Sequence, residues 1–283
     1  MVQALSNEQL KAVAPSIFAQ EPWERMSDKY RFVPTITVLD AMRDNGFVPV
    51  RAQQSRSRIP GKADFTKHMV RFRHQDYIDC SGRVLGEEVP EVVLMNSHDG
   101  TSAYKLDAGI FRLVCLNGMV VKSADTGSIS ARHSGRADIV GEVIEGSFKI
   151  IEEAPKHAEA IQQFKMIELS PADQVAFASA ALAVKGETAA ETFSPELVLR
   201  ARRSADAGNA NGGRDLWRTM NVVQEHIIRG GARTWQRNAE TGQSRRTSLR
   251  AVNSVTEDVR INKALWMLTE HMAGLKTGVV QAA

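Results

Sequence analysis

Hydrophobic and polar residues alternate with a period of two in several runs of the first half of the chain. These runs cover residues 47–53, 65–74, 92–96, 102–106, 109–116, 119–122 and 128–133. Such alternation is typical of strands with one buried face. Asp99-Gly100 and Asn117-Gly118 are dipeptides that favour tight hairpin turns. We therefore predict an antiparallel β-meander of about five or six strands.

Helical spacing of apolar residues precedes this sheet. A capping box at Ser6-Asn7-Glu8-Gln9 begins a helix that we expect to extend to about Gln20. Thr35 begins a second helix, and Asn45-Gly46 supplies its left-handed end. Both helices would pack on the sheet.

From Arg136 onward the apolar period changes to that of a helix. A long helix is predicted to about Lys165, with a break near Pro155, and it would back the sheet. Two further helices begin at Ser170-Pro171 and Ser194-Pro195, where a capping residue precedes a proline.

The last part of the chain is predicted to be mostly helical. One helix covers 215–228, and a capping box at residues 254–257 begins a terminal helix. The polar, Arg-rich segment 232–250 between them is either a hairpin or a disordered arm. The fold class is thus α+β, with an antiparallel meander backed by a long helix and a mostly helical C-terminal half. We expect two domains, 1–165 and 166–283.

Composition is that of an ordinary water-soluble protein, with 43% hydrophobic and 24% charged residues in 283. The first residues lack the basic start and apolar stretch of a signal peptide, so we expect a cytoplasmic protein. Cys80 and Cys115 cannot form a zinc site by themselves. We expect no cofactor.

Positive charge is concentrated in two regions. The net charge is +6 over residues 51–74 and +7 over residues 200–250, and the second region contains eleven arginines and no lysine. The planar guanidinium suits bidentate phosphate contact and stacking on bases. A polyanion is therefore the predicted partner, although a solvated basic face without a ligand remains an alternative.

The strand predicted at 65–74 has three cations on one face, Lys67, Arg71 and Arg73. A core strand would not tolerate them unless that face met solvent or a phosphate backbone. We expect the two histidines of this strand, His68 and His74, to be surface residues.

No nucleotide-binding glycine loop, zinc-protease motif or nucleophile elbow occurs in the sequence. Acidic residues near the meander lie around its turns, as expected for solvated loops: Glu87, Glu88, Glu91, Asp99 and Asp107. A metal-dependent nuclease, which needs converging carboxylates, is the less favoured alternative. His98-Asp99 resembles a catalytic pair, but a turn explains Asp99. We expect no enzymatic activity.

Aromatic residues are interleaved with the arginines of the C-terminal half. Single strands are held by cationic grooves and by aromatic faces that stack bases. Trp217 and Trp266 are more often core residues in such helical patterns. Trp235 lies in a polar context and is the better candidate for base stacking or for a subunit contact.

Several short motifs, in this order, resemble the phage/plasmid-like family of mobile-element proteins, a domain of unknown function. They are residues 30–35 (Tyr-Arg-Phe-Val-Pro-Thr), 46–50 (Gly-Phe-Val-Pro-Val), 96–100 (Asn-Ser-His-Asp-Gly), 111–118 (Phe-Arg-Leu-Val-Cys-Leu-Asn-Gly) and 261–266 (Ile-Asn-Lys-Ala-Leu-Trp). The resemblance covers nearly the whole chain.

The order of elements in residues 1–165 is also similar, more distantly, to the single-strand annealing superfamily of Redβ, RecT, Erf and the eukaryotic Rad-fifty-two proteins. That resemblance implies a curved sheet backed by a helix, a basic groove for single-stranded DNA, assembly into rings or filaments, and annealing without ATP. It rests on topology and implies function by analogy.

Together these observations predict a single-stranded DNA-binding, strand-annealing protein of phage or plasmid origin that works as a homo-oligomer. Duplex DNA and RNA remain alternative ligands. The alternative is a non-enzymatic anti-defence or host-protein-binding module. The expected contact residues are Arg51, Arg56, Arg58, Lys62, Lys67, Arg71, Arg73, Arg229, Arg233, Trp235, Arg237, Arg245, Arg246 and Arg250.

Overall fold

The structure, a computed structural model, describes residues 4–27, 29–78, 88–112, 117–121, 128–131, 133, 138–202, 214–237 and 242–278. The chain divides into two compact units, the first formed by residues 1–155 with 253–256 and the second by 156–252 with 257–283. No helix in the described part of the chain is long and apolar enough to cross a membrane.

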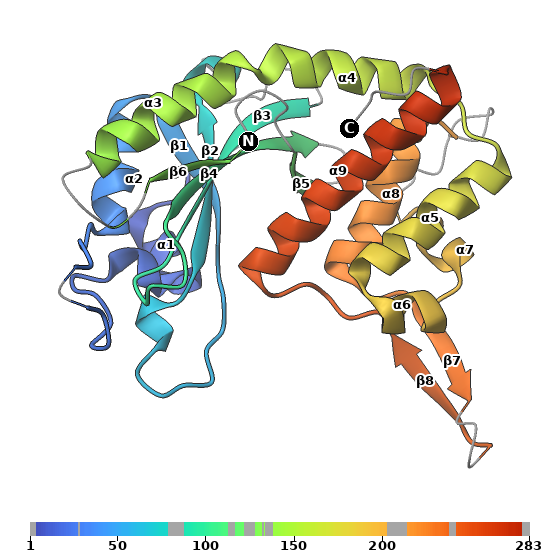
Figure 1. Ribbon diagram of the computed structural model, residues 1–283, viewed down its shortest axis with the longest axis horizontal. Helices are drawn as coiled ribbons and strands as arrows, with labels where there is room; N and C mark the ends of the chain where they lie inside the picture. The colour runs from blue at the N-terminus through green and yellow to red at the C-terminus, as the bar shows by residue number, and fades with distance from the viewer. Residues whose placement is uncertain are drawn as a thin grey trace. The chain divides into compact units, whose positions relative to one another are not determined.

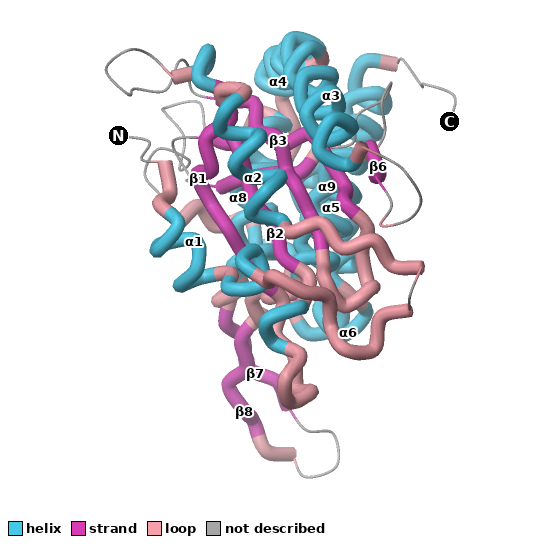
Figure 2. Tube along the Cα trace, turned by 90° about the vertical axis from the view of Figure 1, so that its left-hand side faces the viewer, coloured by secondary structure: helices cyan, strands magenta, loops and turns pink. Residues whose placement is uncertain are grey.

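The first unit is an α+β unit with a six-stranded sheet (Figures 1 and 2). Its elements in chain order are α1 (Asn7–Val13), 3-10 helix Pro15–Phe18, α2 (Thr35–Asp44), β1 (Phe47–Gln54), 3-10 helix Ala63–Phe65, β2 (His68–His74), 3-10 helix Gln75–Tyr77, β3 (Glu88–Asn96), β4 (Tyr104–Arg112), β5 (Asn117–Val120), β6 (Ile129–Ala131) and α3 (Ile139–Glu152). The strand order is β1-β2-β3-β4-β5, and β6 also pairs with β4. Every pairing is antiparallel, as predicted.

Strand register decides which side chains share a face. Phe72 lies opposite Val92, and Leu94 lies opposite Leu106, so these four side chains point to the same face. Helix α3 packs closely on this face, because a Cβ added at Gly146 would lie 2.8 Å from a Leu106 methyl carbon. The meander backed by a long helix is thus confirmed, with α3 lying across the sheet in Figure 1.

Three local predictions about the first unit are wrong in detail. The runs expected as separate strands at 102–106 and 109–116 form one strand where the structure describes them, β4. The helix expected from Asn7 to Gln20 ends at Val13, and a 3-10 helix that begins at Pro15 follows it. Proline lacks the N–H that would continue the α-helix. Asn117-Gly118 does not form a turn, because both residues belong to β5 and lie opposite Arg112 and Phe111.

The second unit is mainly helical. Its elements are α4 (Ala154–Met166), α5 (Pro171–Lys185), α6 (Glu187–Thr192), α7 (Pro195–Val198), α8 (Leu216–Arg229), β7 (Arg233–Arg237), β8 (Ser244–Ser248) and α9 (Val255–Thr277); the first residues of α4 and α9 belong to the first unit. The predicted break in the long helix separates α3 from α4. Trp217 and Trp266 pack edge to face in the core, with ring centroids 6.4 Å apart.

Candidate nucleic-acid interface

Arg71 and Arg73 of β2 are buried, which corrects the expectation that they face solvent or phosphate. They are 1% and 3% exposed. Glu91, on the neighbouring strand β3, accepts hydrogen bonds from Arg71 Nη1 at 2.9 Å and from Arg73 Nε at 2.8 Å. The Arg73 guanidinium also lies over the Phe111 ring, with Cζ 4.1 Å from the ring centroid. The strand therefore tolerates its cations because a carboxylate of the same sheet neutralises part of their charge. This geometry gives no support to a phosphate contact.

The remaining cations of the first basic region differ in their surroundings. Arg51, Arg56 and Arg58 are exposed. Lys62 forms an ion pair with Asp99 at 3.0 Å. Lys67 donates to Thr256 Oγ1 at 3.0 Å, and burial, followed by the charge of Lys105, lowers its pKa. The structure thus leaves the exposed arginines, rather than the strand cations, as candidates for a phosphate contact.

The Arg-rich segment forms a hairpin, which we call the arm (residues 232–250). Strands β7 and β8 extend away from the helices of the second unit in both views (Figures 1 and 2). Ala232 and Leu249 are buried at its base, where the Leu249 N–H donates to the Ala232 carbonyl at 2.8 Å. Among the described residues beyond that base, none is fully buried. The arm therefore offers surface rather than core.

One face of the arm combines a tryptophan with arginines. Trp235 lies directly opposite Arg246, and cross-strand partners share a face. Alternation places Arg233 and Arg237 on the same face as Trp235. The Trp235 side chain is 70% exposed. Arg245 lies opposite Gln236 on the other face.

No carboxylate pairs with the arm's arginines among the described residues. Arg237 Nε donates instead to the Gly242 carbonyl at 3.3 Å. At the edges of the arm, Arg250 is exposed, whereas Arg229 forms an ion pair with Glu225 at 3.4 Å. The predicted site residues of the second region thus converge on the arm itself, and Arg229 is the exception.

A buried polar cluster in the first unit was not foreseen from the sequence. Thr35 Oγ1 lies 2.8 Å from His68 Nε2, 3.0 Å from His98 Nε2 and 3.0 Å from the Asn96 amide nitrogen. His133 Nε2 lies 2.7 Å from Asn96 Oδ1. His68 and His74 are at most 8% exposed, so the expectation of surface histidines is wrong. These residues come from distant segments, and alternation in one strand cannot reveal their meeting.

Hydrogen-bond partners fix the tautomers of two of these histidines. His68 Nδ1 faces the Thr66 carbonyl at 3.2 Å and must donate, so its Nε2 accepts from the Thr35 hydroxyl. His98 Nε2 then donates to Thr35, which leaves His98 Nδ1 as a buried acceptor without a partner among the described residues. These contacts are those of neutral His68 and His98 side chains.

Burial is the main cause of the low pKa values in this cluster. It lowers the pKa of His68 to about 4, and burial together with the neighbouring His68 lowers the pKa of His98 to about 3. A base this weak is a poor proton acceptor near neutral pH. Asp99 is bound by Thr101 and Lys62 rather than by His98. The contacts of His98 and Asp99 are therefore those of structural residues and not those of a catalytic pair.

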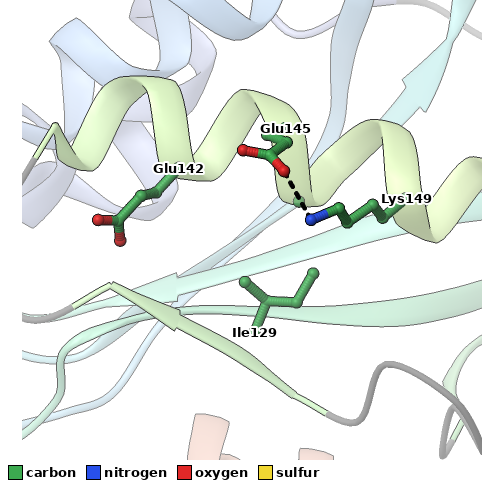
Figure 3. A pocket seen from close by; sticks show the side chains of 5 residues that line it. Ile129, Glu142, Glu145 and Lys149 are labelled. Carbon is green, nitrogen blue, oxygen red and sulfur yellow. Dashed lines mark ion pairs between the residues drawn. The ribbon is translucent and has the colours of Figure 1, made fainter.

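A shallow hollow of about 290 Å³ lies between α3 and β6. Figure 3 shows Ile129 below the helix and the carboxylates of Glu142 and Glu145 along it. Glu145 pairs with Lys149 at 2.6 Å. Because its lining is more acidic than basic, this hollow is unsuited to a polyanion. Among the described residues, no group of three or more His, Cys, Asp or Glu side chains is placed to hold a metal ion, and the two cysteines lie outside the described residues.

A family model described as a domain of unknown function, DUF932, matches residues 22–266. The chain belongs to this family. Two relatives from Escherichia coli (strain K12), the UPF0380 proteins YafZ and YfjQ, are each 37% identical to it over 266 residues. Each alignment covers 94% of this chain and 90% of the relative. No solved structure matches the chain.

Proposed function

We propose that the protein binds single-stranded DNA through the arm and promotes annealing of complementary strands without ATP. The observation that carries this proposal is the 70% exposed Trp235 on a face shared with Arg233, Arg237 and Arg246. Guanidinium groups bind phosphates, and an exposed indole stacks an unpaired base. A duplex offers its phosphates but not its base faces, so this arrangement favours a single strand.

Annealing is the further step of this proposal. Cations that neutralise phosphates reduce the repulsion between complementary strands, while bases outside the stacked contact stay available for pairing. The topological resemblance to annealing proteins supports this step by analogy. We also propose that the protein acts in the cytoplasm as a homo-oligomer encoded by a mobile element, since several copies along one strand would raise the local concentration of binding sites.

Salt dependence tests the phosphate contact. Affinity for a labelled single strand, measured by fluorescence anisotropy, should fall steeply as salt concentration rises, because each neutralised phosphate releases counterion. Arg237→Ala/Arg246→Ala should weaken binding about tenfold and reduce the salt slope by about 1.4, since each phosphate contact contributes about 0.7 for single strands.

The matched control is Lys11→Ala/Lys29→Ala, which removes the same charge from exposed positions outside the arm. It should leave both affinity and slope close to those of the unmodified protein. A flat salt response, or an arm variant indistinguishable from this control, would argue against the proposal.

The arm would also fit an acidic protein surface, because tryptophan and arginine dominate many protein interfaces. A pull-down that recovers one host protein in stoichiometric amount after nuclease treatment, together with no measurable DNA affinity, would favour the host-protein-binding alternative. Recovery that disappears with nuclease treatment supports nucleic acid as the partner.

A further inference from the structure

The first unit has its own tryptophan flanked by cations. Lys62 Nζ lies 4.7 Å from the centroid of the Trp23 ring, and Arg25 Cζ lies 5.1 Å from it. The backbone N–H of Trp23 donates to the His98 carbonyl at 3.0 Å, which fixes the backbone that carries this ring. The ring itself is half-buried. In the sequence, the interleaving of arginines with aromatic residues indicates base stacking in the C-terminal half of the chain, and it does not reveal Trp23.

The loop that supplies Lys62 also presents Arg56 and Arg58. Both arginines are exposed, and neither has an ion pair among the described residues. The base of the loop is held by hydrogen bonds from the Ser55 N–H to the Lys67 carbonyl at 2.8 Å and from Thr66 Oγ1 to the Ser55 carbonyl at 2.9 Å. A fixed base with charged, exposed tips limits the entropy lost when a ligand orders the loop.

Lys62 has a positioning role in this arrangement. Its ammonium group is tied to Asp99 at 3.0 Å while it lies over Trp23. This ion pair compensates its charge and attaches the loop to the turn that contains Asp99. Arg25 therefore supplies the positive charge beside the ring for which the described residues show no ion pair, and the exposed Arg56 and Arg58 add charge on the loop that carries Lys62.

We infer that these five residues, the Trp23 patch (Trp23, Arg25, Arg56, Arg58 and Lys62), form a second contact for single-stranded nucleic acid. This inference rests on the proposed function, because it assigns a second site to the same ligand. The patch belongs to the first unit and the arm to the second, so each compact unit has one contact. One chain can then hold two strands, or two parts of one strand.

Two contacts on one chain supply what annealing requires. Holding two strands on the same protein converts their encounter into an effectively intramolecular one, at a local concentration set by the distance between the contacts. A chain with one contact can bind a strand but must meet a second loaded chain before pairing begins. Loss of either contact should therefore slow annealing more than it weakens binding of a short strand.

The experiment counts bound strands. Native mass spectrometry at low salt would use a thymidine oligonucleotide of about eight nucleotides, short enough to occupy one contact. The unmodified protein should bind two strands per chain. Arg56→Ala/Arg58→Ala should bind one, and Trp235→Ala/Arg246→Ala should also bind one. Lys11→Ala/Lys29→Ala, the matched control, should bind two.

The outcomes separate this inference from the proposed function. One strand per chain for the unmodified protein, retained by Arg56→Ala/Arg58→Ala and lost in the arm variant, overturns the second contact and leaves the arm as the binding site. No bound oligonucleotide in any variant overturns both. Two strands in the loop variant, as in the control, overturn the assignment to the Trp23 patch.

Discussion

Glu91→Gln should lower the free energy of unfolding by about 3–5 kcal/mol, because removing one partner of a buried ion pair leaves a charge without compensation. Here the loss affects Arg71 and Arg73 together, since both donate to the same carboxylate and both are at most 3% exposed. Glutamine keeps the shape of the side chain but not its charge. Urea unfolding followed by circular dichroism measures the change.

Two further variants test whether the loss in Glu91→Gln comes from the buried charges. Glu24→Gln, at an exposed loop position, should change the free energy of unfolding by less than about 0.5 kcal/mol. Replacing Arg71, Glu91 and Arg73 together by apolar residues of similar volume should recover most of the loss, because no charge is then left buried. Less than about 1 kcal/mol lost in Glu91→Gln would show that solvent reaches these guanidinium groups.

Acidification from about pH 6.5 to pH 4.5 should destabilise the first unit strongly. Burial lowers the pKa of His68 to about 4 and that of His98 to about 3 in the folded chain, whereas an unfolded histidine has a pKa of about 6.5. Below pH 6.5 the unfolded state binds protons that the folded state does not bind. The contribution of each neutral buried histidine to the free energy of unfolding is therefore fully present above about pH 6.5. As the pH falls below this value, the free energy of unfolding decreases by about 1.4 kcal/mol per pH unit for each histidine.

A variant identifies the source of this slope. His98→Asn replaces the imidazole, including the Nδ1 atom that has no partner among the described residues, by a shorter amide that does not titrate. Urea unfolding across this pH range should show a slope smaller by about 1.4 kcal/mol per pH unit. His271→Asn, at an exposed position, should keep the original slope. A slope unchanged in His98→Asn would contradict the neutral buried state of His98.

Local patterns predicted much of the fold because they depend on neighbouring residues. Alternation identified most strands of the sheet, although it divided β4 into two, and the capping box at Ser6 is present at the start of α1. A proline after Ser170 begins α5 as expected. The interruption at Pro15 could also have been read from the sequence, because the same rule that placed a break near Pro155 applies there.

Contacts between segments that are distant in the sequence cannot be predicted from such local patterns. Arg71 and Glu91 meet because β2 and β3 pair in one register, which places Arg71 opposite Val93 and puts Glu91, two residues before Val93, on the same face. The sequence of β2 alone does not show that a carboxylate of β3 lies beside its arginines. The buried polar cluster around Thr35 needs four segments to converge, at residues 35, 68, 96–98 and 133. In contrast, the arm is local in sequence, so its arginines and Trp235 could be predicted together.

Photo-crosslinking shows directly whether the arm contacts the nucleic acid. A single strand containing iododeoxyuridine forms crosslinks with an aromatic side chain stacked on the base, and peptide mapping identifies the residue. We expect a crosslinked peptide from residues 232–250, with the modification at Trp235. A strand that stays bound while no crosslink forms within 232–250 would contradict this contact.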